Sequence, residues 1–303
     1  MSWISKALAG AVIIVALAGC DSTEVEPFIE SDRYYTVWGV MDMARDTHWV
    51  RVIPIGDSIA VSADGFEAPT VTLTDALTGR VSTWQDTLWQ FEDGRSGLLY
   101  YLEKRVVPGR SYALRIEDTA GRVTTSGTTI PTPPGYEIGP EAITPFGSVV
   151  QVGQTFTWIG LPDNPYRMRR VYRFSSSVSD IFRDVSITFE DVPPVNNGIS
   201  AIPMTFAADR ILVREKIPDP AKFLFMGLGM EVVLLDSDYA PPGGRFDAEV
   251  LSEPGTFTNV DNGFGFFGSI ARYSAEWTIS ERAAKALGYV SSEGLSKGVA
   301  TAE

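Results

Sequence analysis

The only cysteine of the chain, Cys20, stands directly after an apolar N-terminal segment. Lys6 supplies a positive charge, residues 7–17 are almost entirely apolar, and two small residues follow before the thiol. This order is typical of a secretory signal. The apolar run is shorter than the ~20 residues that span a bilayer comfortably. We therefore predict an exported protein whose signal peptide ends immediately before Cys20.

The residues around the predicted cleavage point also point to a covalent modification. Leu17, Ala18, Gly19 and Cys20 resemble the lipobox of bacterial lipoproteins. The resemblance implies that the Cys20 sulfur receives a diacylglycerol and becomes the mature N-terminus, with fatty acids such as palmitate as the anchor. Two or more acyl chains make such an attachment stable. The alternative is an incidental thiol beside an ordinary cleavage site. A redox role is disfavoured, because no second cysteine is present to form a disulfide.

The charge balance argues against nucleic acid as a partner. The chain has 25 basic and 38 acidic residues, which give a net charge of −13. Nucleic-acid binding requires a concentrated basic face. The densest basic group, residues 167–170, is interpreted as a solvated strand edge. The acidic balance suits a soluble, exported body instead.

Few residues of the chain are suited to catalysis or metal binding. His48 is the only histidine, which excludes a cluster of histidines and cysteines around a metal, and we interpret it as a structural or surface residue. No G-x-S-x-G elbow precedes a helix. Residues 236–238 and 259–263 carry oxygen ligands suited to calcium, but turn formation explains their Asp and Asn residues. We expect no metal, no catalytic residue and no cofactor beyond the covalent lipid.

Aromatic residues gather between residues 84 and 101. Trp84 and Trp89, with Phe91, Tyr100 and Tyr101 nearby, form a candidate aromatic platform for stacking on sugar rings or for binding a partner. The alternative is core packing, which alternate aromatic residues of a sandwich usually serve.

A second candidate segment, residues 259–268, is rich in glycine and phenylalanine. Its glycines permit positive φ angles or close approach of two backbones, and its phenylalanines add apolar mass. We predict a binding or docking loop, or alternatively a tight crossing between strands. The candidate residues are Asn259, Gly263, Phe264, Gly265, Phe266, Phe267 and Gly268.

The elements that must position these residues are predicted to be β-strands. From residue 34 onward, short runs of β-branched and aromatic residues alternate with turn signals, as in residues 34–40, 48–53 and 111–116. This spacing favours a β-sandwich. Strand-like runs continue beyond the prolines of residues 130–135 and include residues 211–213.

We therefore predict an all-β fold with two β-sandwich-like domains in tandem, of the immunoglobulin or transthyretin kind, and a short C-terminal helix. Ser280 is the expected N-cap of that helix and Gly288 its end. The predicted order is signal peptide 1–19, lipidated tether 20–33, β-sandwich domain 34–130, Pro-rich linker 131–141, second β-rich domain 142–280, and short helix with frayed tail 281–303.

Three segments resemble an uncharacterised lipoprotein family of Bacteroidetes-type bacteria. They are an early strand ending in Gly39-Val40, a Pro-Gly-x-x-Tyr-x-Leu segment at residues 108–114, and an Asn-x-x-x-Gly-x-Gly-Tyr/Phe-Phe-Gly signature at residues 259–268. Genes of this family often neighbour those of TonB-dependent outer-membrane receptors, which implies an accessory role in uptake. The family has no established catalytic residues, so the resemblance transfers none to this chain.

These features together predict an acyl-anchored lipoprotein of the cell envelope, at the outer membrane, on its periplasmic or surface face. We expect a non-catalytic binding or scaffolding accessory whose partners are the membrane, through the lipid, and a TonB-dependent receptor. One alternative is a carboxylate-dependent glycan hydrolase, since that chemistry needs only two suitably placed carboxylates. Another is a purely structural envelope protein.

Overall fold

The computed structural model describes residues 33–55, 68–90, 96–146, 149–161, 165–176, 182–189, 191–217, 223–236 and 258–291. Its strands are β1 (Tyr35–Asp42), β2 (Thr47–Pro54), β3 (Thr70–Asp75), β4 (Val81–Thr83), β5 (Gln85–Gln90), β6 (Ser96–Glu103), β7 (Ser111–Glu117), β8 (Val123–Thr129), β9 (Gly135–Ile138), β10 (Ala142–Phe146), β11 (Val149–Ile159), β12 (Arg167–Ser176), β13 (Phe182–Thr188), β14 (Ile199–Thr205), β15 (Phe223–Leu235), β16 (Val260–Asp261), β17 (Gly263–Trp277) and β18 (Val290–Ser291). The helices are α2 (Phe206–Lys216) and α4 (Glu281–Leu287).

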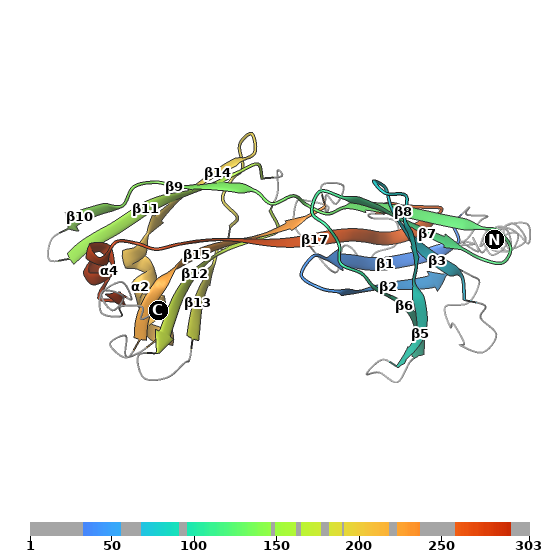
Figure 1. The fold of residues 1–303 in the computed structure, drawn as a ribbon, viewed down its shortest axis with the longest axis horizontal. Coiled ribbons are helices and arrows are strands. Elements are labelled where there is room, and N and C mark those ends of the chain that lie inside the picture. The colour runs from blue at the N-terminus through green and yellow to red at the C-terminus, as the bar shows by residue number, and fades with distance from the viewer. Residues whose placement is uncertain are drawn as a thin grey trace, which may run out of the picture. The chain divides into compact units, whose positions relative to one another are not determined.

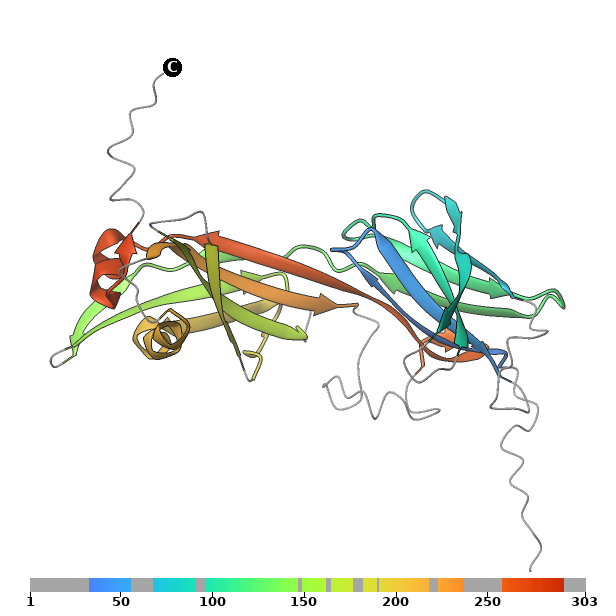
Figure 2. The same cartoon turned by 90° about the horizontal axis from the view of Figure 1, so that it is seen from below.

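The described strands form three sheets (Figures 1 and 2). The largest has the strand order β13-β12-β15-β17-β1-β2-β6-β5, with β18 paired to β15. A second sheet has the order β16-β8-β7-β3-β4, and a third has the order β10-β11-β14 with β9 paired to β11. The fold is therefore all-β and sandwich-like, as the sequence predicts.

The first hydrophobic core lies between the β1-β2-β6 part of the largest sheet and the second sheet. In β7, buried and exposed residues alternate strictly, which is the period expected for a strand with one face on a core. Leu114 and Ile116 of β7 join Val37 of β1 and Val50 of β2 in one buried cluster. Burial of these side chains is the main favourable contribution to packing the two sheets together.

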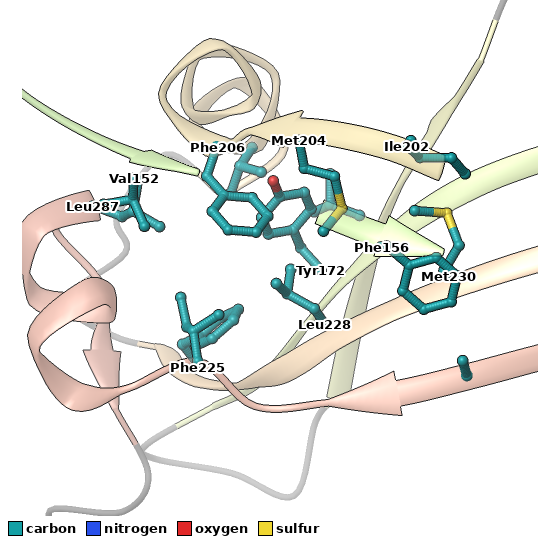
Figure 3. Packing of buried hydrophobic residues seen from close by; sticks show 14 of the residues in the cluster. Val152, Phe156, Tyr172, Ile202, Met204, Phe206, Phe225, Leu228, Met230 and Leu287 are labelled. Atoms are coloured by element: carbon teal, nitrogen blue, oxygen red, sulfur yellow. The ribbon is translucent and has the colours of Figure 1, made fainter. Parts of the chain in front are cut away.

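The second hydrophobic core lies between β12 and β15 of the largest sheet and β11 and β14 of the third sheet. Figure 3 shows Phe156, Tyr172, Met204 and Leu228 meeting there. Helices α2 and α4 add Phe206 and Leu287, among other residues, to this cluster.

Helix α2 corrects the strand predicted at residues 211–213. Phe206, Asp209 and Val213 are buried within the helix, and Ile217 is buried just after it. This spacing of three or four residues is the helical period. Ile211 and Leu212 are exposed on the opposite side of the helix. The apolar run at residues 211–213 therefore resembles a strand in isolation, but the residues before and after it follow the helical period.

The predicted C-terminal helix is confirmed as α4. The Ser280 hydroxyl accepts a hydrogen bond from the backbone N–H of Ala283 at 3.2 Å, which is an N-cap interaction. Gly288 ends the helix with a left-handed φ of 79°, a conformation that glycine adopts readily.

Strand β17 pairs with strands that belong to both cores (Figure 1). Its first half, from Gly263 to Ile270, lies parallel to β1. Its second half, from Ile270 to Trp277, lies antiparallel to β15. Residues 260–270, which the sequence analysis placed in the second domain, therefore pair with β8 and β1 of the first. Strand β9 lies inside the predicted linker and pairs with β11.

Candidate functional site

The predicted signal peptide and lipid attachment site lie outside the described residues. Leu17, Ala18, Gly19 and Cys20 all belong to this part of the chain, so lipidation remains a prediction. In the part of the chain that the structure describes, neither helix is long and apolar enough to cross a bilayer.

The glycine- and phenylalanine-rich segment forms strands rather than the predicted docking loop. Val260 and Asp261 form β16, and Gly263 begins β17. Phe267 is fully buried in the first core. Phe266 is also buried, but outside that core, where Trp38 and Leu235 pack against it. The Phe264 side chain is only partly buried. The segment is thus built into two sheets, as β16 at the end of one and β17 inside the other, and most of its apolar mass contacts the protein itself.

The glycines of this segment are required by the close approach of β17 to β1. At Gly265, φ is +95° and a methyl group would overlap the carbonyl oxygen of Val37. At Gly263, an added Cβ would lie 2.6 Å from the carbonyl oxygen of Tyr35. At Gly268, an added Cβ would overlap the ring of Phe266. Gly263 and Gly265 therefore reflect strand pairing, whereas Gly268 leaves room for the Phe266 ring of the same strand.

The described polar residues of the two calcium candidates have structural roles, whereas residues 237–238 lie outside the described part of the chain. The Asn259 side chain accepts a hydrogen bond from the N–H of Phe267 and donates one to its carbonyl oxygen, at 3.0 and 2.7 Å. Buried Asp236 accepts hydrogen bonds from the Thr128 hydroxyl and the Thr129 N–H. Asn262 adopts a left-handed φ of 54°. Within the described ranges, no three His, Cys, Asp or Glu residues are grouped so that they could hold a metal ion.

The two tryptophans of the predicted aromatic platform lie in different environments. Trp84 is only 4% exposed and packs in the first core, whereas Trp89 on β5 is 49% exposed. Tyr100 is also buried in that core, and Phe91 lies outside the described residues. The platform as predicted is therefore wrong for Trp84, and Trp89 remains a surface candidate.

Trp89 lies in an aromatic group that the sequence analysis did not assemble. The ring of Trp49 on β2 is 40% exposed and lies 5.3 Å from the ring of Tyr101 on β6, centroid to centroid. Trp49 also meets Trp89 edge to face at 6.1 Å. We call Trp49, Trp89 and Tyr101 the outer aromatic cluster.

Strand register explains why the outer aromatic cluster forms. Trp49 is the direct neighbour of Tyr101 across β2 and β6, and directly opposed side chains on one sheet face are in contact distance. Trp89 lies opposite Gly97 on β6. Positions 97 and 101 lie on the same face of β6, because successive side chains of a strand alternate, so Trp89 shares that face with Trp49 and the two rings meet.

Polar side chains border the outer aromatic cluster. Gln85 lies opposite Tyr101 and accepts a hydrogen bond from its hydroxyl group. Alternation along each strand places Arg51 of β2 and Thr87 of β5 on the same sheet face. The face thus combines exposed π-surfaces with hydrogen-bonding groups, which suits binding of a ligand that has both apolar and polar edges.

The sequence around Trp49 contains a signal for its exposure. In residues 48–53, His48, Val50 and Val52 are buried, whereas Trp49 and Arg51 are exposed. The period-two pattern assigns Trp49 to the face opposite the core. A tryptophan on that outer face is a stronger indication of a surface site than clustering along the chain.

The basic group at residues 167–170 lies on an inner strand rather than at a sheet edge, and only part of it is solvated. Strand β12 lies between β13 and β15, and Arg170 is buried. Its Nη1 atom lies 2.6 Å from Oδ2 of Asp209 on α2. Tyr172 also donates a hydrogen bond to Asp209. Burial raises the pKa of Asp209 above its usual range, and Arg170 and Tyr172 oppose this shift.

Comparisons with known proteins add little to this geometry. No family model matches the sequence, and no curated protein is found to be similar. Among solved structures, a pullulanase from Anoxybacillus sp. LM18-11 matches with a TM-score of 0.23 and 9% identity, over 65% of this chain and 24% of that chain. The same enzyme complexed with maltotriose matches with a TM-score of 0.20 and 9% identity, over 64% and 24%. These similarities are too weak to assign a fold or a function.

The effect of protonating a buried histidine can be tested at His48, because it is the only histidine of the chain. It is 2% exposed, its Nε2–H donates to the Lys104 carbonyl oxygen at 2.8 Å, and its Nδ1 has no hydrogen-bond partner among the described residues. Burial lowers the pKa of His48 below its ordinary value of 6.5, against opposing contributions from the Lys104 carbonyl and two nearby aspartates.

The folded protein is therefore expected to lose stability as pH falls below about 6.5, because the unfolded chain then binds a proton that folded His48 resists. His48 contributes at most ~1.4 kcal/mol per pH unit to the change of the free energy of unfolding with pH. Urea unfolding of the wild type and His48→Gln between pH 5 and 7.5 measures this dependence. The free energy of unfolding of the variant should change less with pH over this range, and an equal pH dependence in the two proteins would contradict the prediction.

Proposed function

We propose that this chain is an acyl-anchored lipoprotein of the cell envelope, whose β-rich part is a non-catalytic binding or scaffolding accessory of an outer-membrane uptake receptor. The observation that carries the proposal is the position of Cys20, the only cysteine, at the end of Leu-Ala-Gly-Cys after an apolar run. A chance cysteine would have to fall at the one place where lipidation requires it.

The chain that follows Cys20 suits a tether. Residues 21–32 are rich in acidic residues and contain Pro27. They can span at most ~40 Å, and β1 begins shortly afterwards at Tyr35. A folded body attached in this way stays close to the membrane and to proteins embedded in it.

The arrangement of the described sheets also supports a scaffolding role. Backbone hydrogen bonds join β17 to β1 and to β15 along its length. A buried hydrogen bond from Thr128 and one from the Thr129 N–H fix Asp236 beside β8. Sites supported by packed strands are held more precisely than sites on loops.

Replacing Cys20 by serine is expected to abolish acylation, because a hydroxyl group cannot take the place of the lipidated thiol. Metabolic labelling with a radioactive fatty acid, followed by detergent phase separation, measures the change. The variant should carry no label and move to the aqueous phase. Ser22→Ala is the matched control and should remain labelled. Labelling of Cys20→Ser at the wild-type level would refute the proposed anchor.

The receptor partner is tested separately in native membranes. Chemical cross-linking of the intact protein, followed by mass spectrometry, should recover a TonB-dependent outer-membrane receptor. The same experiment with Cys20→Ser should recover less of it, because the variant is no longer confined to the membrane. A cross-linked sample from labelled, membrane-bound protein that contains no such receptor would contradict the accessory role.

A further inference from the structure

We propose that the outer aromatic cluster binds a neutral glycan, with sugar rings stacked on Trp49 and Trp89 and hydrogen bonds made by polar side chains on the same sheet face. This inference rests on the proposed role as a binding accessory and names the chemical class of its ligand.

The aromatic rings provide the apolar part of such a site. Trp49 and Trp89 are 40% and 49% exposed although both lie within regular strands. The face of an aromatic ring carries partial negative charge, which attracts the C–H groups on one side of a sugar ring. The contacts of Trp49 with Tyr101 and Trp89 already limit the freedom of the rings, so that little entropy remains to be lost on binding.

Polar groups beside the rings complement the hydroxyl groups of a sugar. Arg51 carries donors, Thr87 carries a hydroxyl group and Gln85 carries both donors and acceptors. Gln85 also accepts from Tyr101, which holds both side chains in place. An acyl chain would offer no partners to these groups, whereas a glycan would.

The size of the cluster favours a glycan over a protein partner or a second copy of this chain. With aromatic side chains of about 150–250 Å² each, the exposed surface of the three rings is on the order of 300 Å². A stable protein–protein interface buries about 800 Å² on each partner. The cluster is large enough for a few sugar residues and too small to hold a folded protein alone.

Charge favours a neutral ligand. The chain carries a net charge of −13, and exposed Glu103 lies two residues from Tyr101 on β6. Arg51 and Glu103 carry opposite charges on this face, so the site itself has no excess of positive charge for an anion, and the acidic chain as a whole disfavours anionic polysaccharides and anionic lipid headgroups. A neutral polysaccharide is not subject to this effect.

Affinity electrophoresis of the intact, lipidated protein in detergent tests the proposal. The gels contain a soluble β-glucan, xylan or galactomannan as neutral probes, and alginate as the anionic probe. The wild type should be retarded by at least one neutral polysaccharide and not by alginate. Trp49→Ala and Trp89→Ala should each weaken binding about tenfold or more, because each removes a stacking surface.

Phe182→Ala is the matched control, because Phe182 is an aromatic residue that is 71% exposed on β13, outside the cluster. It should bind as the wild type does. Circular dichroism and acyl labelling of the two tryptophan variants should be unchanged, which separates this test from that of the anchor. Unchanged binding by both tryptophan variants, or no retardation of the wild type by any neutral probe, would overturn the proposal.

Two further results would also overturn the proposal. If the Cys20→Ser protein sediments with zwitterionic phosphatidylcholine vesicles and loses this binding with Trp49→Ala, the cluster would be a lipid-binding surface. If sedimentation equilibrium shows a dimer that Trp89→Ala dissociates, the cluster would be an interface between two copies of the chain.

Discussion

Replacing Gly265 by alanine is expected to lower the free energy of unfolding by about 3–5 kcal/mol, or to prevent folding altogether. Two costs combine at this position. The φ angle of +95° is unfavourable for a residue with a Cβ, and that Cβ would overlap the Val37 carbonyl oxygen of β1. Chemical denaturation, monitored by tryptophan fluorescence, measures the loss. The parallel pairing of β17 with β1 is the feature at risk.

Gly79→Ala separates the two costs. Gly79 also has a positive φ, of 65°, but an added Cβ would meet nothing within 4 Å. Its replacement should cost only the ~1–2 kcal/mol of the left-handed conformation. If the two variants lost equal free energy of unfolding, the close approach of β17 to β1 would add nothing to the cost of Gly265→Ala. This result would contradict the explanation given for the glycine-rich segment.

The second large effect is expected at the buried ion pair between Arg170 and Asp209. Asp209→Ala should lower the free energy of unfolding by about 3–5 kcal/mol, because it leaves the Arg170 guanidinium buried without its counter-charge. The two side chains are only 8% and 9% exposed, so solvent screens the pair weakly. Urea unfolding at pH 7 measures the change.

A double variant tests whether the unpaired charge is the cause. Arg170→Met combined with Asp209→Leu removes both charges and should recover most of the loss, since apolar residues can replace a buried pair at little cost. About 1 kcal/mol should remain, because the Tyr172 hydroxyl loses its acceptor. Asp46→Ala breaks the exposed pair with Arg105 and should change stability little. A double variant as unstable as Asp209→Ala would refute this account.

The sequence predicts those helices and strands whose signals lie within a few positions of one another along the chain. The alternation of Tyr112, Leu114 and Ile116 identifies the buried face of β7. Ser280 and Gly288 mark the ends of α4, because capping interactions act over only three or four positions. The short apolar run at residues 211–213 is ambiguous by itself, and only the helical spacing of the buried residues on either side of it indicates α2.

Features that depend on distant pairing could not be predicted in this way. The parallel pairing of β1 with β17 joins Tyr35 to Gly263, and nothing in either segment alone specifies the other. The outer aromatic cluster has the same origin, since Trp49 and Trp89 meet only because β2, β6 and β5 are adjacent. The burial of Arg170 depends on α2, which the sequence analysis did not identify.

The position of β17 has a consequence for how the protein is made. One of the two neighbours of β1 is β17, which is distant in sequence, so the largest sheet cannot close until residues 263–277 are available. Such long-range pairing slows folding. A product that ended before residue 263 would expose the open edge of β1 and would be expected to aggregate rather than persist as a half-size protein.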